Sequence, residues 1–161
     1  MKIMMVCLGN ICRSPLAEGV LQKKANEAGL NWQVDSSGTN GYHTGEAPHK
    51  LSQKVALLHG IDISEQRAWR FKPSFFEEYD KIYVMANDVL ADVRRMSGNQ
   101  FDARKIDFLL NELTPGTNQD LTDPWYGEEP GYHDVYELID KACDAILLKH
   151  MAKLTTEKIN Q

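Results

Sequence analysis

The chain has 161 residues, of which 42% are hydrophobic and 25% charged, and its formal net charge at pH 7 is −5. This composition is typical of a globular protein, and the length suits one domain spanning residues 1–161. The negative charge, with no basic run to offset it, argues against a nucleic-acid partner. No apolar stretch has the length of a signal peptide or of a membrane span, so we expect a cytoplasmic protein without a membrane partner.

The cysteine content predicts a reduced protein. Three cysteines, an odd number without secretory context, argue against a disulfide framework. The sequence has neither a Cys-x-x-Cys nor a His-Glu-x-x-His pattern, which are common spacings of zinc ligands. We therefore predict no metal and no other cofactor.

Apolar runs and amphipathic periods alternate along the chain. Strands are predicted from short apolar runs at residues 2–6, 81–85 and 106–110, and a further strand is predicted at residues 32–36, before a loop-like stretch. Helices are predicted at residues 15–28, 51–58, 73–79, 88–96 and 135–151, mostly from apolar residues at three- and four-residue spacing. Residues 120–132 are expected to form a loop, and residues 155–161 a frayed tail.

The order of these elements predicts the fold class. A strand, a helix and a second strand within about 35 residues form a βαβ unit, whose strands are parallel and whose crossover is right-handed. The prediction is an α/β fold: a four-stranded parallel twisted sheet with helices on both faces. Ligands of such sheets bind beyond the carboxyl ends of the strands, where Cys7 follows the first predicted strand.

A tight loop is predicted directly after this strand. Gly9 and Asn10 are residue types that readily accept positive φ, so the chain can curl back with its amides pointing inward. Ser14 is a good N-cap, and Pro15 suits the first position of the following helix. The loop is therefore expected to end at a helix N-terminus.

Residues 7–13 combine an anion site with a nucleophile. Inward backbone N–H groups at the positive end of a helix bind anions, and Arg13 adds a planar fork that matches phosphate oxygens. The same environment favours a thiolate at Cys7, which we expect to be nucleophilic near neutral pH. The alternative is a buried structural cysteine beside an unrelated arginine.

The stretch from Cys7 to Pro15 resembles the phosphate loop of the low-molecular-weight protein tyrosine phosphatases. Later landmarks of that family are matched in the same order by Val34-Asp35-Ser36, Gly41-Tyr42, His59-Gly60-Ile61 and Asp123-Pro124-Trp125-Tyr126-Gly127. The resemblance implies metal-independent hydrolysis of phosphotyrosine and small aryl phosphates through a phosphocysteine intermediate. The expected partner is a phosphotyrosine-containing protein, and the enzyme is expected to be a monomer or a weak dimer. The phosphate-binding residues are expected to be Leu8, Gly9, Asn10, Ile11, Cys12 and Ser14.

A general acid is needed to protonate the phenolate that leaves, and Asp123 is the candidate. Pro124 biases it towards an extended conformation, while Trp125 and Tyr126 supply an apolar wall for a phenyl ring and favour a protonated carboxyl. A turn-forming Asp-Pro on a solvated loop is the alternative reading. Asp120 is a weaker competitor for the acid role.

Other residues receive supporting roles from the resemblance. Asn10, Ser14 and Ser36 are expected to brace the loop by hydrogen bonds, with Ser14 also assisting departure of the thiolate. Tyr42 matches a position that lines the substrate cleft. Cys12 matches the second cysteine of the family's loop.

Cys12, His59 and Cys143 receive further predictions. A thiolate exposed to phosphate is also exposed to peroxide, so we predict a protective Cys7–Cys12 disulfide, with simple packing of Cys12 as the alternative. His59 is expected to be structural and Cys143 to lie in the core.

The chain departs from the family pattern at two places. The stretch Met85-Ala86-Asn87-Asp88 lacks the expected Met-Asp pair, and Glu65 stands where animal members tend to have a histidine.

Two other enzyme classes have a loop that resembles residues 7–13. Arsenate reductases need resolving cysteines that are absent between Gly41 and Leu110. Protein-arginine phosphatases typically have threonine at the position of Ile11, whose bulk favours an aryl ester. A non-catalytic phosphate-binding or thiol-redox module is the remaining alternative.

Overall fold

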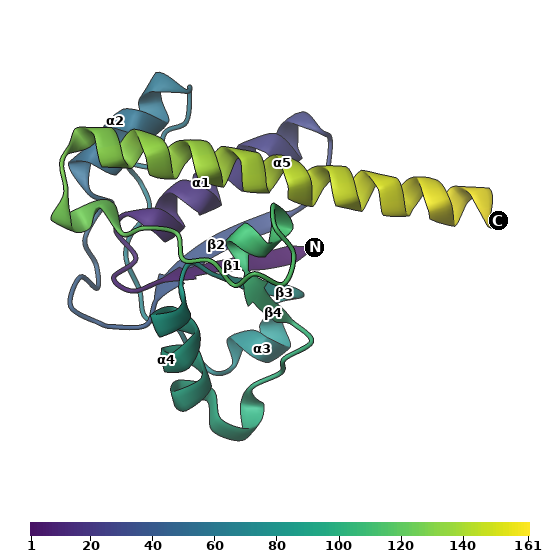
Figure 1. The fold of residues 1–161 in the computed structure, drawn as a ribbon, viewed down its shortest axis with the longest axis horizontal. Coiled ribbons are helices and arrows are strands. Elements are labelled where there is room, and N and C mark those ends of the chain that lie inside the picture. Colours follow the sequence, from purple (N-terminus) through teal and green to yellow (C-terminus); the bar gives the residue numbers. More distant parts are fainter.

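The computed structural model describes residues 1–161, and a four-stranded parallel sheet lies at its centre (Figure 1). The strands are β1 (Lys2–Cys7), β2 (Gln33–Gly38), β3 (Lys81–Val84) and β4 (Ile106–Phe108). Their order across the sheet is β2-β1-β3-β4, and every neighbouring pair is parallel. The predicted fold class is confirmed.

Strand β1 lies between β2 and β3, and its side chains alternate between two apolar layers. Ile3 and Met5 belong to the larger core cluster, whereas Met4 and Val6 belong to the smaller one. All four side chains are fully buried. The continuous apolar run in the sequence therefore reflects a strand covered on both faces.

Helices cover the two faces of the sheet, as Figure 1 shows. The helices are α1 (Arg13–Glu27), α2 (Lys50–Leu58), α3 (Phe75–Glu78), α4 (Asn87–Ser97) and α5 (Glu129–Ile159). Residues of α1, α2 and α5 enter the larger core cluster, and residues of α3 and α4 enter the smaller one. Each side of the sheet thus has its own apolar layer.

The start of α1 differs from the prediction. The helix begins at Arg13, its N-cap is Cys12, and no side chain caps it. Ser14 is therefore inside the first turn instead of preceding it, because its hydroxyl is engaged within the loop described below. Pro15 still lies in the first turn, where its missing N–H does no harm.

Two segments later in the chain also differ. The strand predicted at 106–110 ends at Phe108, and Leu109–Glu112 forms a 3₁₀ helix whose leucines remain buried. The predicted loop at 120–132 contains a short 3₁₀ helix, Pro124–Tyr126, and already includes the first turn of α5. In the first segment the apolar run indicates burial, but it does not distinguish a strand from a tight helix.

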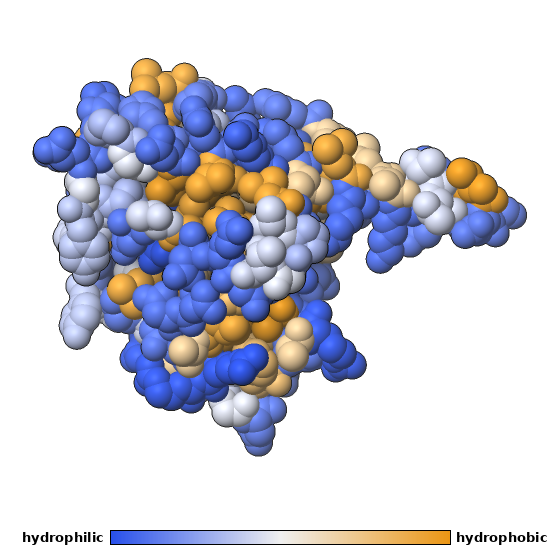
Figure 2. Space-filling view, viewed as in Figure 1, coloured by the Kyte–Doolittle hydropathy of each residue, from blue (hydrophilic) through white to orange (hydrophobic).

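Helix α5 is the longest element, and its C-terminal end projects from the body of the protein (Figure 1). It is helical to Ile159, so it includes most of the segment where fraying is expected. Figure 2 shows apolar residues on this projecting end among hydrophilic neighbours, and the exposed side chains there include Leu148, Met151 and Ile159. None of the helices combines the length and the apolar character that crossing a bilayer requires.

Candidate active site

The phosphate loop, residues 7–13, connects the carboxyl end of β1 to the first residue of α1. Asn10 has φ of 58°, one of only two non-glycine residues in the left-handed region, as its residue type predicts. Gly9 does not have positive φ; instead, a Cβ there would lie 3.1 Å from Cδ2 of His43. Gly38, at the end of β2, packs beneath the loop, because its Cβ would lie 2.8 Å from the carbonyl oxygen of Leu8.

The side chain of Asn10 braces the loop from within. Its Nδ2 donates to Ser14 Oγ at 2.8 Å and to Ser36 Oγ at 3.0 Å. Its Oδ1 accepts the backbone N–H of Trp69 at 3.1 Å. The brace therefore joins α1, β2 and the segment before α3, and the amide satisfies both of its polar atoms while buried.

Cys7 lies at the bottom of the loop and is 3% exposed. Its Sγ is 3.0 Å from Ser14 Oγ and accepts the backbone N–H of Asn10 at 3.3 Å. Ser14 Oγ accepts a bond from Asn10, and its hydroxyl hydrogen can be donated to the sulfur or to the carbonyl oxygen of Ser37, which lies 3.4 Å away. The sulfur is thus bonded to the backbone of the loop and to the first turn of α1.

Arg13 is 3% exposed and lies between the phosphate loop and a second loop. One guanidinium nitrogen donates to the carbonyl oxygen of Leu121 at 2.8 Å. The other lies 3.5 Å from Oδ2 of Asp123. The hydrogen bond to Leu121 fixes one edge of the guanidinium group, and the other edge faces Asp123 in the cavity.

The second loop, residues 120–128, is called the acid loop below. Asp123 is the N-cap of the 3₁₀ helix Pro124–Tyr126, and its Oδ1 accepts the backbone N–H of Trp125 at 3.1 Å. Its side chain is only partly covered. The structure brings Asp123 to Arg13 across 110 positions of sequence, as the resemblance implies.

Asp120 has a different role. Its Oδ1 accepts the backbone N–H of Asn87 at 2.8 Å and the side-chain amide of Asn87 at 2.7 Å. These hydrogen bonds lower the pKa of Asp120 below its usual value. A carboxylate held in this way is a poor proton donor, so Asp120 is a structural partner of α4, near one of the departures from the family pattern.

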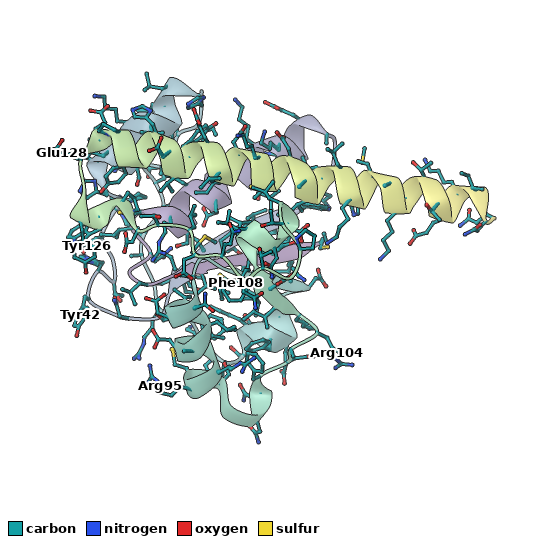
Figure 3. The ribbon with its side chains drawn as sticks, in the orientation of Figure 1. Tyr42, Arg95, Arg104, Phe108, Tyr126 and Glu128 are labelled. Carbon is teal, nitrogen blue, oxygen red and sulfur yellow. The ribbon has the colours of Figure 1, made fainter.

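A cavity of about 270 Å³ opens above the phosphate loop. Its walls are formed by Cys7, Leu8, Gly9, Ile11, Cys12, Arg13, Asn40, Tyr42, His43, Asp123, Trp125 and Tyr126. Tyr42 and Tyr126 are 88% and 85% exposed, and Figure 3 shows both on the same side of the molecule, pointing outward. They therefore form the rim.

Most of the predicted site residues line this cavity, but two of the predicted phosphate ligands do not. Asn10 and Ser14 lie behind the loop as braces, together with Ser36. Sequence reasoning missed Asn40 and His43, which line the wall beside Tyr42. Their only sequence signal was their position next to a predicted cleft residue.

A partly buried carboxyl group extends the brace beyond Ser36. Ser36 Oγ donates to Glu18 of α1 at 2.9 Å, and the indole N–H of Trp69 donates to the carbonyl oxygen of Ser36. Burial is the main reason that the pKa of Glu18 rises to about 7. Helical periodicity places Glu18 beside apolar positions but does not reveal this partner.

Cys12 lines the cavity and also contacts α5. Its sulfur lies 3.7 Å from the hydroxyl group of Tyr132, and burial raises the pKa of the Cys12 thiol to about 12. All three cysteines are free thiols, and Cys143 lies in the core. The Cys7–Cys12 disulfide stays a prediction. No group of three or more His, Cys, Asp or Glu side chains is arranged to hold a metal ion.

The comparisons with known proteins all point to one family. The family model described as low molecular weight phosphotyrosine protein phosphatase matches residues 2–159. A low molecular weight protein-tyrosine-phosphatase of Streptomyces coelicolor is 33% identical over 150 residues, which cover 91% of each chain. The human low molecular weight phosphotyrosine protein phosphatase is 34% identical over 149 residues, covering 91% of this chain and 94% of the human one.

Solved structures agree with the sequence matches. The protein tyrosine phosphatase of Entamoeba histolytica, solved with Hepes in its active site, is 32% identical with a TM-score of 0.86, covering 95% of this chain and 98% of that one. Wzb of Vibrio vulnificus, solved with benzylphosphonate, is 26% identical with a TM-score of 0.82, covering 92% and 97% of the two chains.

Proposed function

The chain belongs to the low molecular weight phosphotyrosine protein phosphatase family and hydrolyses phosphotyrosine, and from this premise we propose that Cys7, Arg13 and Asp123 carry its chemistry. The observation that supports the assignment best is the convergence of these three side chains on one cavity. A buried sulfur with two hydrogen-bond donors, a buried guanidinium and a carboxyl group are the parts that transfer of a phosphoryl group to sulfur needs.

In the first step, the Cys7 thiolate attacks the phosphorus atom. An S–P bond forms and the P–O bond to the tyrosine breaks, which leaves a phosphocysteine. Asp123 gives its proton to the departing phenolate oxygen, which becomes a phenol. The position of Asp123 beside Arg13, at 3.5 Å, supports this role because it puts the carboxyl group next to the guanidinium that would hold the phosphoryl oxygens.

In the second step, water attacks the phosphocysteine. Asp123, now a carboxylate, takes a proton from the water, and the P–S bond breaks to release phosphate and the Cys7 thiolate. The hydroxyl group of Ser14, 3.0 Å from the sulfur, donates to the leaving thiolate. Asp123 returns to its protonated form, so the cycle closes.

The charge of the transferred group is balanced by Arg13 and by the backbone N–H groups of the phosphate loop. A fixed guanidinium and preorganised amides stabilise the equatorial oxygens in the transition state. We infer that the enzyme needs no metal ion for this purpose.

The substrate that we propose is a phosphotyrosine side chain of a cytoplasmic protein. Ile11 and Trp125 offer apolar walls to a phenyl ring, and Tyr42 and Tyr126 form the rim. Three free thiols suit a reducing compartment. The bulk of Ile11 in the wall favours an aryl ester over phosphoarginine.

Replacement of the nucleophile tests this mechanism. Cys7→Ser is expected to lower the turnover of a phosphotyrosine peptide by about 10⁴-fold or more, because the hydroxyl group is a far weaker nucleophile. Binding of inorganic phosphate, measured by calorimetry, is expected to remain. Cys143→Ala, which alters a buried thiol of the core, serves as the control and keeps turnover. Full activity of Cys7→Ser would exclude Cys7 as the nucleophile.

A further inference from the structure

The acid loop is held against the protein by aromatic rings. The indole of Trp125 contacts two imidazole rings, with its centroid 5.4 Å from that of His43 and 5.4 Å from that of His49. Trp125 also donates its backbone N–H to Asp123 Oδ1 at 3.1 Å. The residue whose indole these rings contact is therefore also bonded to the carboxyl group of Asp123.

His49 lies where three parts of the site meet. Its backbone N–H donates to the carbonyl oxygen of Ile11 in the phosphate loop at 2.8 Å. Its ring stacks on Tyr132 of α5, with 5.2 Å between centroids and 23° between planes. The same ring meets Trp125 of the acid loop at 82°, an edge-on contact. One side chain thus contacts both the acid loop and the helix that follows it.

The imidazole of His49 also caps α2. Its Nδ1 accepts the backbone N–H of Leu51 at 3.1 Å, so the ring is neutral in this arrangement and carries its hydrogen on Nε2. Burial and the neighbouring Lys50 lower the pKa of His49. The cap and the ring contacts therefore persist together at neutral pH.

We propose that His49 is a positioning residue for the general acid: its ring holds Trp125, and through Trp125 it holds Asp123 at the cleft. The inference rests on the proposed acid role of Asp123. His49 does not line the cavity, so it acts without touching the substrate. Displacement of a reacting group by about 1 Å can slow a reaction by about 10²-fold, so a ring contact that restrains the loop affects proton transfer.

The cap and the ring contacts can be separated by substitution. His49→Asn keeps a good N-cap for α2 without adding charge, but removes the ring. His49→Phe keeps an aromatic ring and removes the Nδ1 acceptor. If His49 acts only as a helix cap, His49→Phe is expected to impair the enzyme more than His49→Asn. If its ring positions the acid loop, His49→Asn is expected to impair proton donation more than His49→Phe.

The experiment compares kcat/KM for phenyl phosphate and 4-nitrophenyl phosphate, because only the poor leaving group depends strongly on the acid. For His49→Asn, the value for phenyl phosphate is expected to fall about tenfold relative to that for the nitrophenyl ester. For His49→Phe, the ratio is expected to stay near that of the wild type, with a fall of about 2–4 °C in Tm from the lost cap.

His59 supplies a matched control at the other end of the same helix. It is the C-cap residue of α2, and its ring stacks on Tyr136 with 3.9 Å between centroids, away from the acid loop. His59→Asn is expected to leave the ratio of the two substrates unchanged. An equal effect of His49→Asn and His59→Asn on the ratio would overturn the proposal.

Two further variants separate this inference from the proposed function. If Asp123→Asn leaves the ratio unchanged, the acid role itself fails, and the inference fails with it. If Asp123→Asn changes the ratio and His49→Asn does not, only the inference fails. In the double variant, His49→Asn is expected to add no further change, since His49 acts through Asp123; an additional loss on phenyl phosphate contradicts this.

Should His49→Asn not fold, Trp125→Leu poses the same question, because it removes the ring that His49 contacts and leaves the cap of α2 intact. Its ratio is expected to shift in the same direction as that of Asp123→Asn. An unchanged ratio in a folded Trp125→Leu enzyme overturns the proposal.

Discussion

The two loops that meet at the cavity are built in opposite ways. In the phosphate loop, Cys7 and Arg13 are almost fully buried, and Asn10 is held by three hydrogen bonds to other elements. In the acid loop, Asp123 and Trp125 are partly exposed and are held by an ion pair at 3.5 Å and by ring contacts. The phosphate loop is thus mostly buried and fixed by hydrogen bonds, whereas the acid loop lies on the surface.

This difference follows from the task of each loop. Stabilising charge on a phosphoryl group requires donors that are fixed before the substrate arrives. Donating a proton to a leaving group requires a carboxyl group at the entrance, where the substrate must also pass. A group at the entrance cannot be buried as deeply, so weaker contacts have to position it.

The largest effect expected from breaking the acid loop is that of Asp123→Asn. With phenyl phosphate, kcat/KM should fall by about 10²–10⁴-fold, because the phenolate must leave without a proton. With 4-nitrophenyl phosphate, whose phenolate is stable, the fall should be much smaller. Steady-state kinetics with both esters measures the difference, with Asp120→Asn as the control in the same loop. An equal loss on both esters would show that Asp123 only shapes the loop.

Breaking the phosphate loop should instead affect all substrates alike. Asn10→Ala removes the brace. It also leaves an alanine at φ of 58°, a left-handed conformation that alanine, unlike asparagine, cannot offset with a side-chain hydrogen bond. We expect kcat/KM to fall by roughly ten- to a hundredfold for both esters, since the loop's donors lose their alignment. Asn118→Ala, at the other non-glycine residue with positive φ, is the control and should cost stability alone. A loss confined to phenyl phosphate would contradict the separation of the two loops.

The brace of the phosphate loop should also make stability depend on pH. The pKa of Glu18 is raised from 4.5 to about 7 in the folded protein, so the folded state binds its proton more tightly than the unfolded state does. Stability from this group is complete below pH 4.5 and is lost as the pH rises towards 7 and beyond.

Glu18→Gln removes this titration. The free energy of unfolding of the variant, relative to that of the wild type, should rise by up to a few kcal/mol when the pH is raised from 5 to 8. Urea denaturation at the two pH values measures the free energy of unfolding of each protein. A difference between the two proteins that is the same at both pH values would assign the dependence to other groups.

The smallest effect expected concerns recovery from oxidation. Peroxide converts the Cys7 thiolate to a sulfenic acid, and condensation with the Cys12 thiol would give a disulfide and water. For this, Cys12 has to give up its contact with Tyr132. After peroxide and then dithiothreitol, wild type should recover more activity than Cys12→Ser, with Cys143→Ser as the control. Equal recovery, or peptide maps without a Cys7–Cys12 link, would make Cys12 a packing residue.

Local sequence patterns determined the sheet and the first loop. The apolar run before Cys7, the turn residues Gly9 and Asn10, and Arg13 lie within one short segment, where neighbouring residues specify the backbone. The positions of β1 and β3 follow in the same way, because burial on both faces leaves a continuous apolar run. The pairing of Cys7 with Arg13 that we propose therefore needed no long-range information.

Only the tertiary structure decided which partner each polar side chain has. Ser14 looked like a helix cap, but its hydroxyl is bound by Asn10 and faces Cys7. The sequence favours Asp123 over Asp120 as the acid, but only the structure shows that Asn87, 33 residues away, holds the carboxylate of Asp120.

The ring contacts of His49 and the bond from Ser36 to Glu18 were also invisible in the sequence. Hydrogen bonds and ring contacts act over a few ångströms, so they depend on how the chain folds back on itself. Periodicity along the chain reports only which residues are buried.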